Sequence, residues 1–225
     1  MPANGPIRSR NRTIRQLVEP GVIAVVRDSE PVEIRPLIEA LLAGGVVAVE
    51  LTMTTPGALE AVSIAVREFA GRVVVGAGSV LDTQSCRAAL AAGADFIVSP
   101  ILRPELVAIC HEAETPVMLG AFTPTEAQNA HDAGADFVKI FPADSLGPAF
   151  VKAIRAPMPH LRLVPTGGVD VNTFGAFLKA GCVAAGAGST LVSAAILKGR
   201  NWTELTRLAA ALVQESRRNR PISIA

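Results

Sequence analysis

The stretch AHDAGADFVKIFP, residues 130–142, joins the alanine-rich end of a helix to a glycine and then to a short apolar run typical of a strand. Three further stretches repeat this order: ALLAGGVVAVELT at 40–52, ALAAGADFIVSP at 89–100 and FLKAGCVAAGAGS at 177–189. A glycine just after the last helical residue is a usual helix ending, because glycine adopts the left-handed backbone conformation without strain. The repeats therefore predict four helix-to-strand units. Their C′ glycines are expected at Gly44, Gly93, Gly134 and Gly181.

Four other strand-like runs, GVIAVVR, VVVGAGS, PVMLG and LRLVPTGG, alternate with these repeats. Helical segments separate all neighbouring runs, so every connection is a crossover and the sheet should be parallel. Eight such units in 225 residues predict a (β/α)₈ TIM barrel, to which we add an extra N-terminal helix. An open doubly wound sheet is the alternative, but no G-x-G-x-x-G motif follows the first strand. The strands are expected at about 21–27, 46–53, 73–78, 95–99, 116–120, 136–141, 161–166 and 182–186.

The composition limits the kind of partner. With 225 residues and 50% hydrophobic content, the chain is expected to form one domain over residues 1–225, with residues 1–12 flexible. A formal net charge of +1 and the lack of a long basic run give no electrostatic reason to expect nucleic acid or a membrane surface. The expected partner is therefore a small molecule.

The location is expected to be cytoplasmic. The first twenty residues lack the apolar core of a secretory signal. Three cysteines without a C-x-x-C pair favour reduced, buried thiols over disulfides or a zinc site. The uncharged run 180–197 has the length of a membrane span, but its alanines and glycines favour a buried strand, a glycine turn and a helix start.

A single lysine lies within the apolar run FVKIF. Because side chains alternate along a strand, Phe137, Lys139 and Phe141 share one face, and in a barrel either face is enclosed. Burying an ammonium group is costly unless it is paired or neutral. Lys139 is therefore either the ion-pair partner of a core carboxylate or a nucleophile, whose neutral amine attacks a ketone to form an imine.

A single glutamate lies within the second strand in the same way. In VVAVELTM, Glu50 shares a face with Val46, Ala48 and Thr52. One interpretation makes Glu50 the counter-ion of Lys139 or of Arg27. The other makes it a general acid and base that moves protons during imine chemistry. The two interpretations are compatible.

Two glycine-rich turns follow the last two strands. PTGGVD at 165–170 and AGAGST at 185–190 occur where barrels of this type often bind phosphate through backbone N–H groups and a helix N-terminus. Glycine after a strand is also ordinary turn chemistry, so the prediction depends on the two turns occurring together. The candidate phosphate ligands are Gly167, Gly168, Gly188 and Ser189.

Several motifs together resemble a known family. AGG-x-x-x-x-E-x-T, VGAGSVL, SP after the fourth strand, VKIFPA and PTGGV span about residues 20 to 192. They are similar to the class I 2-keto-3-deoxy-6-phosphogluconate (KDPG) aldolases and their 4-hydroxy-2-oxoglutarate (KHG) aldolase relatives. The resemblance implies a homotrimer without metal or other cofactor, Lys139 as the Schiff-base residue and Glu50 as the proton-transfer residue. It further implies a pyruvate site of Ser79, Pro100, Phe141 and Thr166, and a phosphate site of Gly167, Gly168 and Ser189.

The chain departs from the family at one position. The best-known gluconate-type members carry an arginine four residues after the glutamate, where this chain has Thr54. Arg27, at the end of the first strand, is the alternative ligand for the substrate carboxylate. Galactonate-type members also carry an arginine there and have a similar KIFP-x-x-x-x-GP stretch. The configuration of the sugar acid is therefore left open, and Thr52, Thr54 and Arg27 join the substrate-binding set.

The resemblance implies a lyase that cleaves a 2-keto-3-deoxy-6-phospho sugar acid, of gluconate or galactonate type, to pyruvate and D-glyceraldehyde 3-phosphate. Cleavage of 4-hydroxy-2-oxoglutarate to pyruvate and glyoxylate is a further expected activity. One alternative is a phosphate-binding TIM-barrel isomerase or epimerase, which with a metal would need histidines and carboxylates gathered at strand ends. The other is a non-catalytic sugar-phosphate binding protein, which would not need Lys139 and Glu50 inside the barrel.

Overall fold

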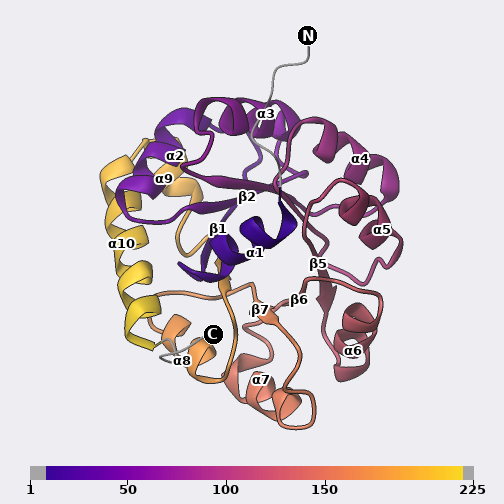
Figure 1. Ribbon diagram of the computed structural model, residues 1–225. Helices are drawn as coiled ribbons and strands as arrows, with labels where there is room; N and C mark the ends of the chain where they lie inside the picture. Colours follow the sequence, from indigo (N-terminus) through magenta and orange to yellow (C-terminus); the bar gives the residue numbers. More distant parts are fainter. Residues whose placement is uncertain (1–8, 220–225) are drawn as a thin grey trace.

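The computed structural model describes residues 9–219, and within them eight parallel strands form one sheet in the order β7-β6-β5-β4-β3-β2-β1-β8. A parallel bridge between Thr166 and Gly186 joins the two outer strands, so the sheet closes into a barrel (Figure 1). The predicted TIM barrel is confirmed. The strands are β1 Val22–Val26, β2 Ala48–Thr52, β3 Val74–Gly78, β4 Phe96–Val98, β5 Val117–Ala121, β6 Phe137–Ile140, β7 Leu163–Pro165 and β8 Ala185–Ala187.

Helices surround the barrel in the described residues, one after each strand, with α1 before β1 and α10 at the end (Figure 1). This alternation gives the parallel sheet the cover that both of its faces require. The helices are α1 Arg10–Val18, α2 Ile34–Ala43, α3 Ala58–Glu68, α4 Thr83–Ala91, α5 Glu105–Glu112, α6 Pro124–Asp132, α7 Gly147–Arg155, α8 Phe174–Lys179, α9 Ala194–Gly199 and α10 Trp202–Asn219.

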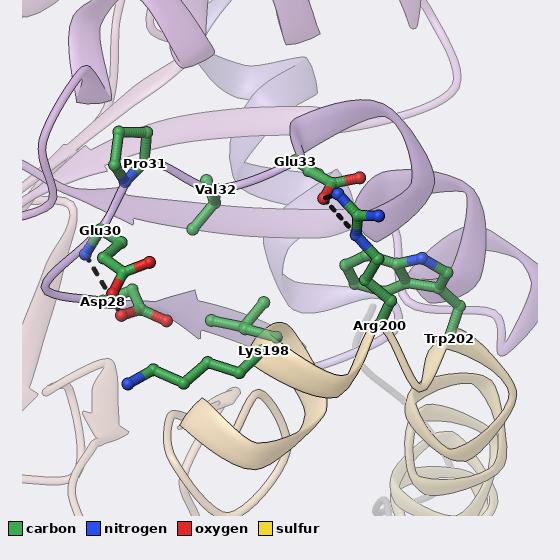
Figure 2. A pocket seen from close by; sticks show the side chains of 9 residues that line it. Asp28, Glu30, Pro31, Val32, Glu33, Lys198, Arg200 and Trp202 are labelled. Atoms are coloured by element: carbon green, nitrogen blue, oxygen red, sulfur yellow. Dashed lines mark hydrogen bonds and ion pairs between the residues drawn. The ribbon is translucent and has the colours of Figure 1, made fainter.

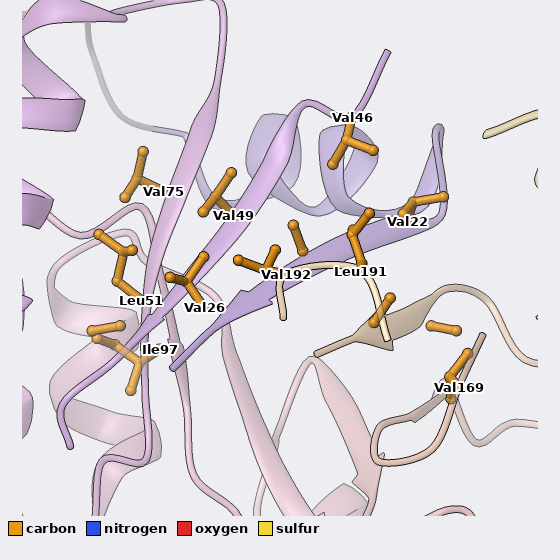
Figure 3. Close-up of a cluster of buried hydrophobic side chains, with 14 of the residues drawn as sticks. Val22, Val26, Val46, Val49, Leu51, Val75, Ile97, Val169, Leu191 and Val192 are labelled. Carbon is orange, nitrogen blue, oxygen red and sulfur yellow. The ribbon is translucent and has the colours of Figure 1, made fainter. Parts of the chain in front are cut away.

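The strands separate two hydrophobic clusters. The outer cluster lies between strands and helices and contains Val49 and Leu51 of β2 (Figure 3). It also contains Val138 and Ile140 of β6. The inner cluster fills the barrel and contains Phe137. Because side chains alternate along a strand, Lys139 points into the barrel like Phe137.

Helix α1 closes one end of the barrel. Leu17 belongs to the inner cluster, and Ile14 packs against it. Arg10 forms an ion pair with Asp136, with 3.0 Å between Nε and Oδ1, just before β6 begins. The predicted extra N-terminal helix therefore covers the N-terminal ends of the strands (Figure 1), and the C-terminal ends are left for chemistry.

Two boundaries differ from the sequence predictions. The expected flexible segment 1–12 falls for the most part outside the described residues, but its last residues, from Arg10, belong to α1. The expected strand 182–186 is observed at Ala185–Ala187. The run 180–197 contains this strand, a turn and the start of α9 at Ala194, as the sequence predicted. In the described part of the chain, no helix combines the length and apolarity that a membrane crossing requires.

The predicted C′ glycine of α2 was wrong by one position. Gly44 has a φ of −82°, and the left-handed residue is Gly45 with a φ of +85°. Gly44 instead allows α2 and α10 to approach, since a β-carbon there would lie 2.5 Å from Ala209 Cβ. The other three glycines are confirmed as left-handed helix endings: Gly93, Gly134 and Gly181, with φ of 101°, 93° and 102°.

Candidate active site

Lys139 and Glu50 meet inside the barrel. They lie on β6 and β2, four strands apart in the ring, so their side chains reach toward each other across the interior. Lys139 Nζ is 3.4 Å from Glu50 Oε1, and the two residues are 3% and 2% exposed. The ammonium also lies 5.4 Å from the centre of the Phe141 ring. The predicted ion pair is therefore present, enclosed by the strands.

A glycine in the neighbouring strand makes space for the carboxylate. Gly78 of β3 pairs with Thr52 of β2, and a β-carbon on Gly78 would overlap Glu50 Oε1. Gly78 lies within the VGAGSVL motif, but its packing role depends on the register of two strands. This register is the reason that sequence reasoning missed Gly78.

The buried pair has the composition that imine chemistry needs. Imine formation needs an amine and a group that carries protons, and Lys139 and Glu50 bring an amine nitrogen and a carboxyl group within 3.4 Å of each other. Enclosure in a barrel of low polarity strengthens the electrostatic interaction between the two groups, since bulk water does not screen it. The arrangement can therefore provide a nucleophile and a proton carrier at one point.

Arg27 and Ser79 lie together at the C-terminal ends of β1 and β3. Arg27, just after β1, is exposed, and its Nη2 donates a hydrogen bond to Ser79 Oγ over 3.2 Å. Ser79, just after β3, has a φ of 58°, a left-handed conformation that is costly for a residue with a side chain. The structure thus brings together two predicted substrate-binding residues from loops 52 positions apart.

Three threonines link the end of β2 to the loop after β1. The Thr52 hydroxyl lies 3.1 Å from that of Thr54 and 3.2 Å from that of Thr55. Thr55 Oγ1 in turn accepts a hydrogen bond from the backbone N–H of Asp28. Thr52 and Thr55 are buried, whereas Thr54 is exposed. Thr55, which sequence reasoning missed, therefore joins Thr52 and Thr54 to the segment that follows Arg27.

Pro100 and Phe141 line an open apolar depression of about 550 Å³ at the ends of β4, β5 and β6. Gly120 of β5 keeps Pro100 close to the barrel mouth, because a β-carbon on Gly120 would overlap the Pro100 carbonyl. The backbone N–H of Gly120 also donates to the Ile101 carbonyl. Two predicted pyruvate-site residues therefore lie on one apolar wall.

The two glycine turns lie side by side after β7 and β8. Gly167 and Gly168 have φ of 98° and 68°, which a side chain would disfavour. Thr166 packs against Gly186, and the Thr190 hydroxyl donates to the Val169 carbonyl. These contacts connect the predicted phosphate loops.

A turn follows the end of β8. Gly188 begins a turn, its carbonyl accepting from the N–H groups of Leu191 and Val192. Ser189 is exposed in this turn. The short helix α9 begins only at Ala194, so its N-terminus is five residues beyond Ser189 in the chain. The candidate phosphate ligands Gly188 and Ser189 therefore belong to a turn and not to a helix N-terminus.

Elsewhere, the described residues form a further hollow but no cluster of potential metal ligands. Within residues 9–219, no group of three His, Cys, Asp or Glu side chains comes together as a metal site would require. A separate hollow of about 310 Å³ lies between the loop after β1 and α9. Figure 2 shows Asp28, Lys198 and Trp202 among the residues that line it. Arg200 pairs there with Glu33, with 2.5 Å between Nε and Oε1. No predicted site residue lines this hollow.

Comparisons with known proteins agree with this geometry. Residues 14–208 match the family model described as KDPG and KHG aldolase. The chain is 36% identical to a 2-dehydro-3-deoxy-phosphogluconate aldolase of Treponema pallidum, over 86% of this chain and 92% of the relative.

Solved structures of aldolases also resemble this chain. One described as native KDPGal superposes with a TM-score of 0.81 at 29% identity, over 88% of this chain and 95% of the other. The KDPG aldolase of Legionella pneumophila, with pyruvate captured as a covalent carbinolamine, superposes with a TM-score of 0.80 at 30% identity. The match covers 89% of this chain and 97% of the other. A chain of a protein cage designed by fusing symmetric oligomeric domains superposes with a TM-score of 0.80 at 28% identity. The match covers 88% of this chain and 72% of the other.

Proposed function

The chain belongs to the KDPG and KHG aldolase family, and we propose that it is an imine-forming lyase that cleaves 2-keto-3-deoxy-6-phospho sugar acids of gluconate or galactonate type. The products are pyruvate and D-glyceraldehyde 3-phosphate. The observation that carries this proposal is the enclosed pair of Lys139 and Glu50, with 3.4 Å between Nζ and Oε1. Cleavage of 4-hydroxy-2-oxoglutarate to pyruvate and glyoxylate is a second proposed reaction, since it needs the same pair.

Lys139 begins the proposed reaction by adding its neutral amine to the C2 ketone. Glu50 delivers a proton to the carbinolamine hydroxyl, which leaves as water and gives an iminium ion. Glu50 then takes the proton of the C4 hydroxyl, the bond between C3 and C4 breaks, and its electrons move into the iminium as an enamine. The aldehyde leaves, the enamine gains a proton at C3, and water releases pyruvate from Lys139.

The other predicted residues hold the two ends of the substrate in this proposal. Arg27 binds the carboxylate, since a guanidinium suits a carboxylate and Thr54 offers no charge. The hydroxyls of Thr52 and Thr54 supply hydrogen bonds beside it. The pyruvate portion lies among Ser79, Pro100, Phe141 and Thr166.

The phosphate lies at the turns after β7 and β8. Backbone N–H groups of successive glycines form concave sites for anions without a side-chain cation. The left-handed φ of Gly167 and Gly168 supports this role, as does the link between the loops at Thr190. Gly188 and Ser189 complete the proposed phosphate site.

Pyruvate release tests the proposed function. The purified protein, treated with EDTA, is expected to release pyruvate from a 2-keto-3-deoxy-6-phospho sugar acid, measured by NADH oxidation with lactate dehydrogenase. Imine chemistry requires no metal, so EDTA should not lower the rate. Assays with the gluconate and galactonate isomers and with 4-hydroxy-2-oxoglutarate rank the substrates. Failure to cleave any of them, or dependence on a divalent metal, contradicts the proposal.

We further propose that the enzyme is a homotrimer. Leu81, Ile101 and Phe122, in the loops after the neighbouring strands β3, β4 and β5, are 46%, 48% and 44% exposed. Large apolar side chains gathered on one surface are typical of protein contacts. The similarity to a chain of a cage built from symmetric oligomeric domains supports assembly. Light scattering is expected to give the mass of three chains, and a monomeric mass at micromolar concentration would contradict the proposal.

The cellular setting is also a proposal. The three cysteines are free and buried, which suits a reducing compartment, and we therefore place the enzyme in the cytoplasm. Its reaction fits Entner–Doudoroff-type breakdown of sugar acids, because that chemistry ends in cleavage to pyruvate and a triose phosphate.

A further inference from the structure

The loop after β6 lies directly against the glycine turn after β7. The Ala143 N–H donates to the Thr166 carbonyl over 2.8 Å, and the Thr166 N–H donates to the Ile140 carbonyl over 2.9 Å. A β-carbon on Gly167 would lie 3.3 Å from the Ala143 nitrogen. Two hydrogen bonds and this close approach therefore hold the two loops together.

The next residue of the first loop, Asp144, touches the second glycine of the turn. A β-carbon on Gly168 would overlap Asp144 Cβ and lie 3.2 Å from its Oδ2. The other carboxylate oxygen, Oδ1, accepts a hydrogen bond from the Ser145 N–H over 2.9 Å. Asp144 is exposed, so its carboxylate is at the surface of the glycine turn.

No basic residue occurs in the loops that form this region. Residues 141–147, 166–173 and 188–193 contain no lysine or arginine, whereas they contain Asp144 and Asp170. Asp170 uses its Oδ1 within its own turn, where it accepts from the N–H groups of Asn172 and Thr173. A phosphate held by the turn would therefore meet backbone N–H groups on one side and the Asp144 carboxylate at the edge.

We propose that Asp144 is a specificity-determining residue, whose carboxylate weakens the binding of phosphorylated substrates relative to unphosphorylated ones. This inference depends on the proposed function, because it assumes a phosphate at Gly167 and Gly168. A phosphate monoester carries close to two negative charges at neutral pH, so a neighbouring carboxylate repels it. A terminal hydroxyl carries no charge and can donate a hydrogen bond to the same carboxylate.

The Asp144→Asn variant tests the proposal. Asparagine retains an oxygen that can accept from the Ser145 N–H, so only the charge is removed. The KM of the 6-phosphorylated substrate is expected to fall about three- to tenfold. This factor corresponds to the loss of the repulsion between a carboxylate and a phosphate that lie several ångströms apart near a protein surface. The KM of the unphosphorylated 2-keto-3-deoxy sugar acid should not fall. Inorganic phosphate should inhibit the variant more strongly by a similar factor, and 0.5 M KCl should reduce the difference.

Two control variants separate this effect from others. Asp132→Asn makes the same charge change at the end of α6, where Asp132 accepts from the Gln128 side chain, and should leave both KM values unchanged. Asp144→Glu keeps the charge and should behave like the wild type. An unchanged or higher KM for the phosphorylated substrate, or equal changes for both substrates, would overturn the inference. Failure of the wild type to cleave either substrate would instead count against the proposed function.

Discussion

Replacement of Lys139 by methionine is expected to lower kcat by roughly 10⁴-fold or more, because it removes the proposed nucleophile. Methionine has a similar length and keeps the apolar contacts inside the barrel, but it has no amine to add to a ketone. Glu50 then stays buried without its partner. Loss of the partner is expected to lower the free energy of unfolding by about 3–5 kcal/mol. Thermal unfolding of the variant checks that it is folded at the assay temperature.

Borohydride reduction with pyruvate, followed by peptide mass mapping, measures the role of Lys139 directly. The wild type should yield a reduced pyruvyl adduct on Lys139, and Lys139→Met should yield none. Lys152→Met is the matched control, since Lys152 is exposed on α7 and its loss should change neither the adduct nor the rate. An adduct on a different lysine, or full activity without Lys139, would refute this role.

The barrel was predictable from the sequence because its signals are local. Each glycine helix ending and each apolar run depends on residues close in the chain. The number of units favoured a closed barrel, and the bridge between Thr166 and Gly186 closes it. Gly44 shows the limit of this reasoning. Either glycine of the pair could end α2 by sequence alone. The packing of Gly44 against Ala209, which lies 165 positions further along, is not visible in the local sequence.

The centre of the site was also predictable, but its surroundings were not. Strand alternation and the apolar neighbours of Lys139 and Glu50 indicated that both are buried. Their approach across the barrel follows from the positions of β2 and β6 in the ring. In contrast, the space that Gly78 leaves and the contact of Asp144 with Gly168 depend on register and loop packing. No pattern in a single segment reports such contacts.

Replacement of Glu50 by glutamine is expected to lower kcat by about 10²- to 10⁴-fold, the usual contribution of a general acid and base. Glutamine has nearly the same shape and can still hydrogen-bond to Lys139, but it cannot take a proton. Glu39→Gln is the matched control, because Glu39 is exposed on α2. It should retain the wild-type rate.

Imine formation and enamine formation can be measured separately, and the two measurements distinguish the role of Glu50 from that of Lys139. With Glu50 replaced, the lysine still has its amine, so prolonged borohydride treatment with pyruvate should still label Lys139. Formation of the enamine requires a base, and exchange of the pyruvate methyl protons for deuterium, followed by NMR, should therefore slow with kcat. If the variant exchanged these protons at the wild-type rate, Glu50 would be only the counter-ion of Lys139, and the proton carrier would have to be a different group.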